Sequence, residues 1–252
     1  MRRPYIMVAP NGARRNKSDH PTLPITVEEI VETAAACQVG GADALHLHVR
    51  DETGGHSLDP GRYREALAEL AARVPELRIQ ITTEAAGLFD VKTQYECLLQ
   101  VSPEYASIAV REIARDEALA PFVYRTCVEQ GTEVQHILYD EADIAQLRDW
   151  QRRGVVCPEQ DAVLFVLGRY APGQVSAPAD LIPFRTALPE AANWMVCAFG
   201  PGEHTCLIEA ARNGGALRVG FENSLQAANG IPHQDNAASL AALLRQLERQ
   251  PA

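Results

Sequence analysis

The sequence predicts an α/β protein built as a single (β/α)8 TIM barrel, because short apolar runs alternate with longer amphipathic segments along a chain of suitable length. The chain has 252 residues, and single barrels commonly reach this size. No shift in composition and no Ser/Gly-rich linker divides it, so residues 1–252 are expected to form one catalytic domain. A doubly wound open sheet is the alternative, but no G-x-G-x-x-G motif follows the first expected strand.

Eight short apolar runs are expected to form the strands of the barrel. Several are rich in β-branched residues and continuously apolar, which is typical of parallel strands that are buried on both faces. The runs are residues 5–9, 44–49, 77–82, 105–110, 133–138, 162–167, 194–198 and 216–219.

An amphipathic segment follows each expected strand. Thr26 with Glu29 forms a capping box that begins the first helix, which extends to about residue 40. Asp59 and Pro60 suit the N-cap and first position of the next helix, which continues to residue 73. The remaining helices are expected at residues 90–99, 117–129, 141–152, 178–186, 203–213 and 237–250.

The overall composition excludes several classes of protein. The net charge of -10 argues against a nucleic-acid partner, which usually requires a basic face. No run approaches the roughly 20 apolar residues of a membrane span, and no secretory signal is recognisable, so a cytoplasmic protein is expected. The six cysteines form no C-x-x-C pair and are expected to be buried thiols.

The clearest chemical signal is the alternation of histidine with apolar residues in the second expected strand. Side chains alternate across a strand, so His46 and His48 share one face, while Leu45 and Leu47 face the helices. Barrel active sites lie at the C-terminal ends of the strands, and two imidazoles there can converge on one ion such as zinc. The alternative is a pair of core histidines that are satisfied by hydrogen bonds.

A third ligand is expected from the end of another strand, because catalytic zinc usually takes three protein ligands. Glu222 directly follows the last expected strand and is the best candidate. Arg218 lies within reach of it if the segment bends; the alternative is a surface glutamate with a stabilising arginine. His56, in the loop of residues 52–56, is expected to be a surface residue or part of a lid.

Polar residues also end the third expected strand, where Thr82, Thr83 and Glu84 could bind or deprotonate a substrate. The alternative for these three is an ordinary helix N-cap. Ser107 and Arg111 lie at the end of the fourth strand, where Arg111 could clamp a carboxylate or phosphate. Its alternative is an ion pair with a neighbouring acidic side chain, Glu112 or Asp116.

The loop after the first strand carries an Asn11-Gly12 turn and three cations, Arg14, Arg15 and Lys17. Over the mouth of a barrel, such a loop would suit an anionic substrate or a coenzyme phosphate. A solvated basic loop is the alternative. Cys197 ends the seventh strand, and the glycines that follow it could admit a coenzyme phosphate at a helix N-terminus or form only a tight turn.

Several blocks of this sequence together resemble the β-keto acid cleavage enzyme family, whose best-known activity is 3-keto-5-aminohexanoate cleavage. They span nearly the whole chain and follow the family's order. The blocks are APNGARR at residues 9–15, HP at 20–21, PIT at 24–26, HLHVRD at 46–51, SLDP at 57–60 and RVGFEN at 218–223.

The resemblance implies a barrel with one Zn2+ per chain, held at the positions of His46, His48 and Glu222. It implies a retro-Claisen acyl exchange, in which a 3-keto acid and acetyl-CoA give acetoacetate and a new acyl-CoA. Arg218 matches the catalytic arginine of the family. A homo-oligomer, a tetramer built from dimers, is also implied.

This chain departs from the family pattern at several positions. Asn223 stands where the family commonly has a proton-accepting aspartate, and an amide cannot act as a base near neutral pH. Glu84 is the residue that we expect to accept the proton in place of that aspartate. Arg14 and Gln135 stand where relatives often have glutamate, so an amino-substituted substrate is not expected, whereas Arg111 predicts an anionic or strongly polar substrate tail. The substrate-binding candidates are therefore Asn11, Arg14, Thr82, Thr83, Ser107, Arg111 and Gln135.

Two other functions stay open at this point. A metal-dependent hydrolase or lyase on the same scaffold would act on a small carboxylate substrate without any thioester, since one fold hosts many chemistries. A non-catalytic binding protein is favoured only by Asn223.

Overall fold

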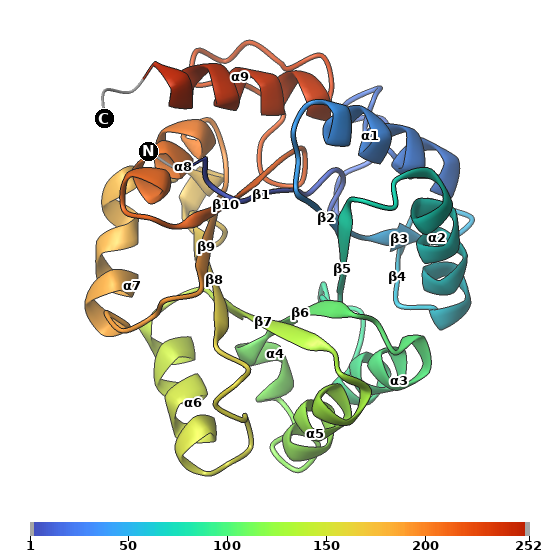
Figure 1. The fold of residues 1–252 in the computed structure, drawn as a ribbon, viewed down its shortest axis with the longest axis vertical. Helices are drawn as coiled ribbons and strands as arrows, with labels where there is room; N and C mark the ends of the chain where they lie inside the picture. Colours follow the sequence, from blue (N-terminus) through green and yellow to red (C-terminus); the bar gives the residue numbers. More distant parts are fainter. Residues whose placement is uncertain (1–2, 250–252) are drawn as a thin grey trace.

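The computed structural model describes residues 3–249, which form a closed barrel of eight parallel strands surrounded by helices (Figure 1). β1 pairs with both β2 and β10, so the sheet closes on itself and the predicted (β/α)8 barrel is confirmed. In order around the barrel, the strands are β1 (Ile6–Val8), β2 (Ala44–Leu47), β5 (Arg78–Thr82), β6 (Tyr105–Ala109), β7 (Glu133–Leu138), β8 (Ala162–Leu167), β9 (Trp194–Ala198) and β10 (Ala216–Val219).

The helices form the outer layer of the molecule (Figure 1). The predicted capping box is confirmed, because Thr26 accepts from the backbone N–H of Glu29 and the Glu29 carboxylate accepts from that of Thr26. Asp59 caps the second helix as predicted. The helices are α1 (Val27–Val39), α2 (Pro60–Arg73), α3 (Val91–Val101), α4 (Val110–Ile113), α5 (Ala120–Gln130), α6 (Glu141–Arg152), α7 (Leu181–Ala187), α8 (Glu203–Arg212) and α9 (Asn236–Glu248), with short 3-10 turns at Pro172–Gln174 and Pro178–Asp180.

A two-stranded hairpin after β2 was not predicted. It consists of β3 (Val49–Arg50) and β4 (His56–Ser57), which pair antiparallel. The Asp51 carboxylate closes the turn, since it accepts hydrogen bonds from the backbone N–H groups of Thr53 and Gly55, each at 2.8 Å. The strand that was expected to continue to residue 49 therefore ends at residue 47, and the chain folds back over the barrel.

Other differences are confined to the ends of elements. The short helix α4 replaces the last residue of the strand expected at 105–110, and α5 begins three residues later than expected. The segment 178–186 divides into a 3-10 turn and α7. The expected end of the last helix, residue 250, lies outside the described residues.

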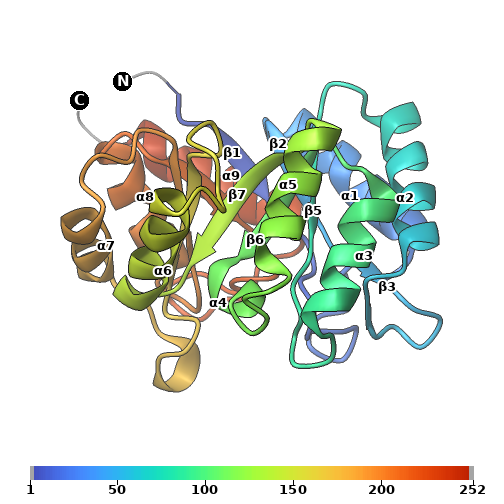
Figure 2. The same ribbon diagram turned by 90° about the horizontal axis from the view of Figure 1, so that it is seen from below.

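Alternation along β2 separates two buried layers. Leu45 and Leu47 pack in the core between the sheet and the helices, whereas Ala44 belongs to an apolar cluster inside the barrel. That inner cluster includes Met7, Tyr105, Leu164 and Met195 among its members. Because apolar side chains fill the barrel interior, the polar side chains of the strand ends gather at one mouth, on the side where the loop after β8 projects in Figure 2.

The end of β10 depends on a glycine. Gly220 has φ +145°, and a Cβ atom there would lie 2.4 Å from the carbonyl oxygen of Ala9.

We expect Gly220→Ala to lower the free energy of unfolding in urea by about 3 kcal/mol, because the substitution combines backbone strain with a clash. Gly230→Ala is the matched control, since Gly230 also has positive φ (+79°) but no heavy atom within 4 Å of the added methyl; it should cost about 1 kcal/mol. Equal losses for the two variants would show that the contact with Ala9 is unimportant.

Candidate active site at the mouth of the barrel

The mouth of the barrel brings together His46, His48 and Glu222, three residues that the sequence indicated as metal ligands. His46 lies in β2 and His48 directly follows that strand; both are buried, and Glu222 follows β10. The Nε2 atoms of the two imidazoles lie 3.1 Å apart, and each is 3.6 Å from Glu222 Oε2. Strand alternation thus places both rings on one side, as expected.

The orientation of His46 is fixed by a residue that the sequence reasoning missed. Gln80 lies beside His46 in the register of β2 and β5, and its Oε1 atom is 2.7 Å from His46 Nδ1. An amide oxygen only accepts, so Nδ1 carries the proton and Nε2 keeps a free lone pair. Gln80 in turn donates to Gln135 Oε1 at 3.1 Å. The strand register could have revealed this pair, since Gln80 faces the same side as Thr82.

The charges of the cluster follow from burial and from one arginine. Burial alone would raise the pKa of Glu222, but Arg218 and the two imidazoles hold it well below its usual value. Burial, followed by the positive charge of Arg218, lowers the pKa of His46 well below 6.5. At neutral pH the cluster therefore combines an anionic carboxylate with at least one neutral imidazole, the protonation states that a metal ion requires.

These residues fit a small divalent cation. The ligand atoms of His46, His48 and Glu222 lie within 4.8 Å of one another. Glu222 Oε2 is buried, and in the part of the chain that the structure describes it has no hydrogen-bond donor. A carboxylate oxygen without a donor, facing two imidazole nitrogens, is typical of a metal site with His and Glu ligands.

Arg218 extends from β10 and is buried beside the cluster. Its Nη2 atom lies 3.3 Å from Glu222 Oε1 and 3.4 Å from Cys197 Sγ. Its Nε and Nη1 atoms are buried and have no acceptor among the described residues. Arg218 can therefore hold Glu222 and still offer N–H donors to an anionic oxygen in the barrel.

The segment that carries Glu222 is bound on several sides. Glu222 N donates to the carbonyl of Ala9 at 3.1 Å, and Phe221 N donates to Asn236 Oδ1 at 2.9 Å. Arg15 donates to the carbonyl oxygens of Phe221 and Asn223. These contacts fix the carboxylate in a loop that would otherwise be mobile.

Glu203, the first residue of α8, is a buried carboxyl that the sequence reasoning also missed. Its Oε1 atom accepts from Gly220 N and from Asn223 Nδ2, each at 3.0 Å. Asn223 Nδ2 donates as well to the carbonyl of Arg218 at 2.9 Å. Asn223, predicted as a catalytic position, thus links Glu203 to the backbone of β10. Acidic residues are common in the first turn of a helix, so no sequence pattern indicates this role for Glu203.

Glu84 lies at the mouth between two arginines. Its Oε1 atom is 3.9 Å from Arg14 Nη2 and 3.8 Å from Arg169 Nη2. Thr82 Oγ1 accepts from Glu84 N at 3.0 Å, and Thr83 Oγ1 donates to the carbonyl of Ser107 at 3.1 Å. The hydroxyl of Thr82 therefore binds the backbone of its own segment and that of Thr83 binds the backbone of β6, whereas the carboxylate of Glu84 faces two cations.

The expectation that His56 lies at the surface is wrong. The β3–β4 hairpin turns its side chain inward, where it is 5% exposed and its ring centroid lies 5.2 Å from that of His48. His56 Nε2 donates to the carbonyl of Glu84 at 2.7 Å. Burial, and then the neighbouring His48, lowers the pKa of His56 to about 3, so the ring is a neutral support that joins the hairpin to the end of β5.

Four other candidates, Asn11, Arg15, Lys17 and Arg111, are held by the protein itself. Asn11 donates to the carbonyls of Pro24 and His48 at 3.1 Å. Arg111 binds Asp140 and Asp143 rather than the acidic neighbours considered from the sequence. Of the cations in the first loop, Lys17 pairs with Glu29 and Arg15 binds backbone carbonyls, which leaves Arg14 facing the mouth. Ser107 Oγ is buried with no partner among the described residues.

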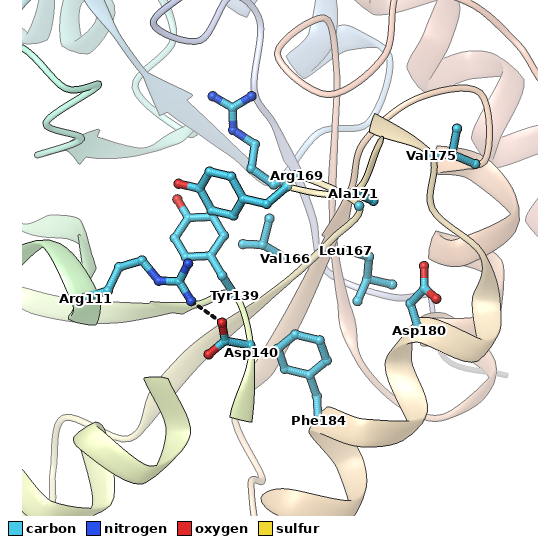
Figure 3. Close-up of a pocket in the computed structure, with 12 residues that line it drawn as sticks. Arg111, Tyr139, Asp140, Val166, Leu167, Arg169, Ala171, Val175, Asp180 and Phe184 are labelled. Atoms are coloured by element: carbon cyan, nitrogen blue, oxygen red, sulfur yellow. Dashed lines mark hydrogen bonds and ion pairs between the residues drawn. The ribbon is translucent and has the colours of Figure 1, made fainter. Parts of the chain in front are cut away.

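A cavity of about 380 Å³ opens beside this cluster, at the ends of β7 and β8 (Figure 3). Charged, aromatic and aliphatic side chains all line it. The lining residues are Arg111, Tyr139, Asp140, Val166, Leu167, Gly168, Arg169, Tyr170, Ala171, Val175, Asp180 and Phe184. The cavity can hold part of a substrate, while His46, His48 and Glu222 lie outside its lining.

Comparison with known sequences identifies the lineage of this barrel. The sequence profile of the β-keto acid cleavage enzymes matches residues 4–252. The chain belongs to the β-keto acid cleavage enzyme family. A 3-keto-5-aminohexanoate cleavage enzyme from Fusobacterium nucleatum is 28% identical over 97% of this chain and 91% of its own length. A 3,5-dioxohexanoate:acetyl-CoA acetone transferase from Paraburkholderia graminis is 24% identical over 98% of this chain and 90% of its own.

Solved structures agree on the fold of this β-keto acid cleavage enzyme. The complex of ObcA with oxaloacetate superposes with a TM-score of 0.69 at 16% identity, over 90% of this chain. This chain spans 64% of the length of ObcA. Among residues 3–249, no helix has both the length and the apolar character needed to cross a membrane.

The buried carboxyl of Glu203 makes the stability of the fold depend on pH. Burial raises the pKa of Glu203 to about 8, above the value of about 4.5 of an exposed glutamate, so its protonated form stabilises the fold. That stabilisation is complete below pH 4.5 and is lost as the pH rises to 8. Because of Glu203, the free energy of unfolding of the wild type should fall by up to about 1.4 kcal/mol for each pH unit between pH 5 and 8. We expect Glu203→Gln to abolish this contribution.

The measurement is urea unfolding at several pH values, with Glu209→Gln on the exposed part of the same helix as the control. An unchanged slope in Glu203→Gln would show that the carboxyl of Glu203 is already ionised in the folded protein at pH 5.

Proposed function

We propose that this chain exchanges acyl groups between a 3-keto acid and acetyl-CoA, with one zinc ion held by His46, His48 and Glu222. The keto acid loses a proton from the carbon between its two carbonyl groups, and the carbanion displaces the CoA thiolate from acetyl-CoA. The thiolate then attacks the original ketone carbon, whose bond to the central carbon breaks. Return of a proton gives acetoacetate, and the remainder of the keto acid leaves as a new acyl-CoA.

The observation that carries this proposal is the convergence of His46, His48 and Glu222 beside the unpaired donors of Arg218. When bound, a zinc ion supplies Lewis-acid polarisation of the ketone. Nε and Nη1 of Arg218 are buried and can donate to an oxygen on which negative charge develops. Membership of the family and the name of the Paraburkholderia relative support acetyl-CoA as the second substrate.

The proton of the keto acid requires a base other than Asn223. Asn223 donates its amide hydrogens to Glu203 and to a backbone carbonyl, and it has no group that can accept a proton at neutral pH. We propose Glu84 for this role, because its carboxylate lies at the mouth of the barrel, 3.9 Å from Arg14 and 3.8 Å from Arg169. Thr82, Thr83, Ser107, Arg111 and Gln135 remain the proposed substrate-binding residues, with Asn11 and Arg14.

We also propose that the chain forms a homo-oligomer, with a tetramer as the expected form. Large apolar side chains are exposed on the neighbouring helices α3 and α5, at Leu99, Phe122 and Val128. An interface over these helices would remove them from water.

The protein should bind about one zinc ion per chain, and Glu222→Gln should weaken zinc binding by at least about 100-fold because it removes the only charged ligand. Zinc affinity is measured by competition with a chromogenic chelator, on protein first stripped with the same chelator. Glu129→Gln, an exposed glutamate on α5, is the control and should bind as the wild type does. Unchanged affinity in Glu222→Gln would contradict the assignment of this ligand.

Product analysis tests the reaction itself. Incubation with acetyl-CoA labelled with 13C in the acetyl group and a panel of 3-keto acids should give labelled acetoacetate and an unlabelled new acyl-CoA. Products that form equally well without acetyl-CoA would indicate a metal-dependent hydrolase or lyase instead.

Glu84→Gln should lower kcat by about 100-fold or more if Glu84 is the base. Glu76→Gln, at an exposed glutamate, is the control and should leave kcat unchanged. Full turnover by Glu84→Gln would exclude Glu84 as the base.

A further inference from the structure

Arg111 and Arg169 both line the cavity, but they differ in how many of their N–H donors have an acceptor. Arg111 Nε lies 3.0 Å from both carboxylate oxygens of Asp143, and its Nη2 donates to Asp140 at 2.5 Å. Its guanidinium also lies over the rings of Tyr139 and Tyr170, at 4.7 and 5.4 Å from their centroids. A substrate anion would have to displace one of these two carboxylates to reach Arg111.

Arg169, which follows β8 and Gly168, is nearly buried and poorly paired. Its side chain is 13% exposed, and its nearest carboxylate oxygen, on Glu84, is 3.8 Å away, beyond hydrogen-bond distance. Within residues 3–249 its guanidinium makes no hydrogen bond. The Cζ atom of Arg169 lies over the ring of Phe199, 4.9 Å from the ring centroid. Figure 3 shows this guanidinium directed away from the pair of Arg111 and Asp140.

The local charge is also unbalanced. Arg14 and Arg169 share the carboxylate of Glu84, at 3.9 and 3.8 Å, and within residues 3–249 neither has a second carboxylate within 4 Å. The chain as a whole is acidic, with a net charge of -10. A nearly buried guanidinium that shares one carboxylate with a second arginine, in the lining of a cavity, is typical of a site that binds an anion.

We propose that Arg169, assisted by Arg14, binds a second carboxylate at the far end of the keto acid, and that the preferred substrates are therefore dicarboxylic 3-keto acids. The proposal rests on the function proposed above and specifies its substrate class. The guanidinium plane offers paired N–H donors that match a carboxylate. The first carboxylate and the ketone would remain with the groups around Arg218, so the two ends of the substrate would be held by different arginines.

The test compares two substrates that differ only at the tail, 3-oxohexanedioate and 3-oxohexanoate, each with acetyl-CoA. Arg169→Met should lower kcat/KM for the diacid by about 10- to 100-fold, the range for a charge-assisted pair, and for the monoacid by less than about 3-fold. Arg169→Lys should recover part of the lost kcat/KM for the diacid, because lysine keeps the positive charge but lacks the paired N–H donors of the guanidinium. Arg111→Met is the matched comparison and should affect both substrates equally.

Equal losses on the two substrates in Arg169→Met would overturn the proposal, as would a diacid-selective loss in Arg111→Met alone. A phosphate of CoA is the other anion that Arg169 could bind. If the diacid-selective loss in Arg169→Met disappears when S-acetylpantetheine replaces acetyl-CoA, Arg169 binds the coenzyme and the proposal is overturned. If the selective loss persists with S-acetylpantetheine, the proposed carboxylate site is supported.

A binding measurement separates this inference from the proposed reaction. Adipate should raise the melting temperature of the wild type more than hexanoate does at equal concentration, and Arg169→Met should abolish the difference. This result does not require turnover, so it would stand even if no keto acid reacted with acetyl-CoA. No difference between adipate and hexanoate on the wild type would overturn the proposed carboxylate site.

Discussion

A carboxylate buried inside a barrel is stable only where positive charge or hydrogen-bond donors surround it. At Glu222 that environment consists of Arg218 at 3.3 Å and two imidazole nitrogens at 3.6 Å. The arginine keeps the carboxylate ionised and disfavours a proton on His46. The same interaction therefore prepares both kinds of metal ligand and leaves one carboxylate oxygen for the ion.

Much of the surrounding loop structure serves to hold this carboxylate in place. A Cβ atom at Gly12 would lie 2.6 Å from Glu222 Cγ, so the first loop can approach closely only with glycine there. Arg50 donates to the carbonyls of that loop, including Arg15 O at 2.9 Å, while Arg15 donates to the segment that carries Glu222. Several cations at the mouth are thus structural, and the number available to a substrate is smaller than the sequence suggests.

The sequence was a sufficient guide to the barrel because buried parallel strands and capped helices have strong local signals. Strands 133–138, 162–167, 194–198 and 216–219 were predicted at their observed bounds. The β3–β4 hairpin was missed, since it depends on the Asp51 side chain rather than on hydrophobic periodicity. Histidines two residues apart on one strand were likewise enough to indicate a shared face.

The partners of the site residues were harder to predict, because they come from elements distant in sequence. The binding of Arg111 by Asp140 and Asp143 depends on where α6 begins relative to β6, and no local pattern reveals this. Arg169 lies in a loop with no motif, and it is distinguished only by the folded structure, in which its guanidinium is nearly buried and lies 3.8 Å from the carboxylate of Glu84.

X-ray absorption at the zinc edge, on protein loaded with one equivalent of zinc, identifies the atoms bound to the ion. With His46, His48 and Glu222 as ligands, we expect only nitrogen and oxygen neighbours, at about 2.0 to 2.2 Å, with the multiple-scattering pattern of two imidazoles. That pattern should fall to one imidazole in His48→Ala. A sulfur shell at about 2.3 Å, or a spectrum that is unchanged in His48→Ala, would place the metal elsewhere and contradict the assignment of His46, His48 and Glu222.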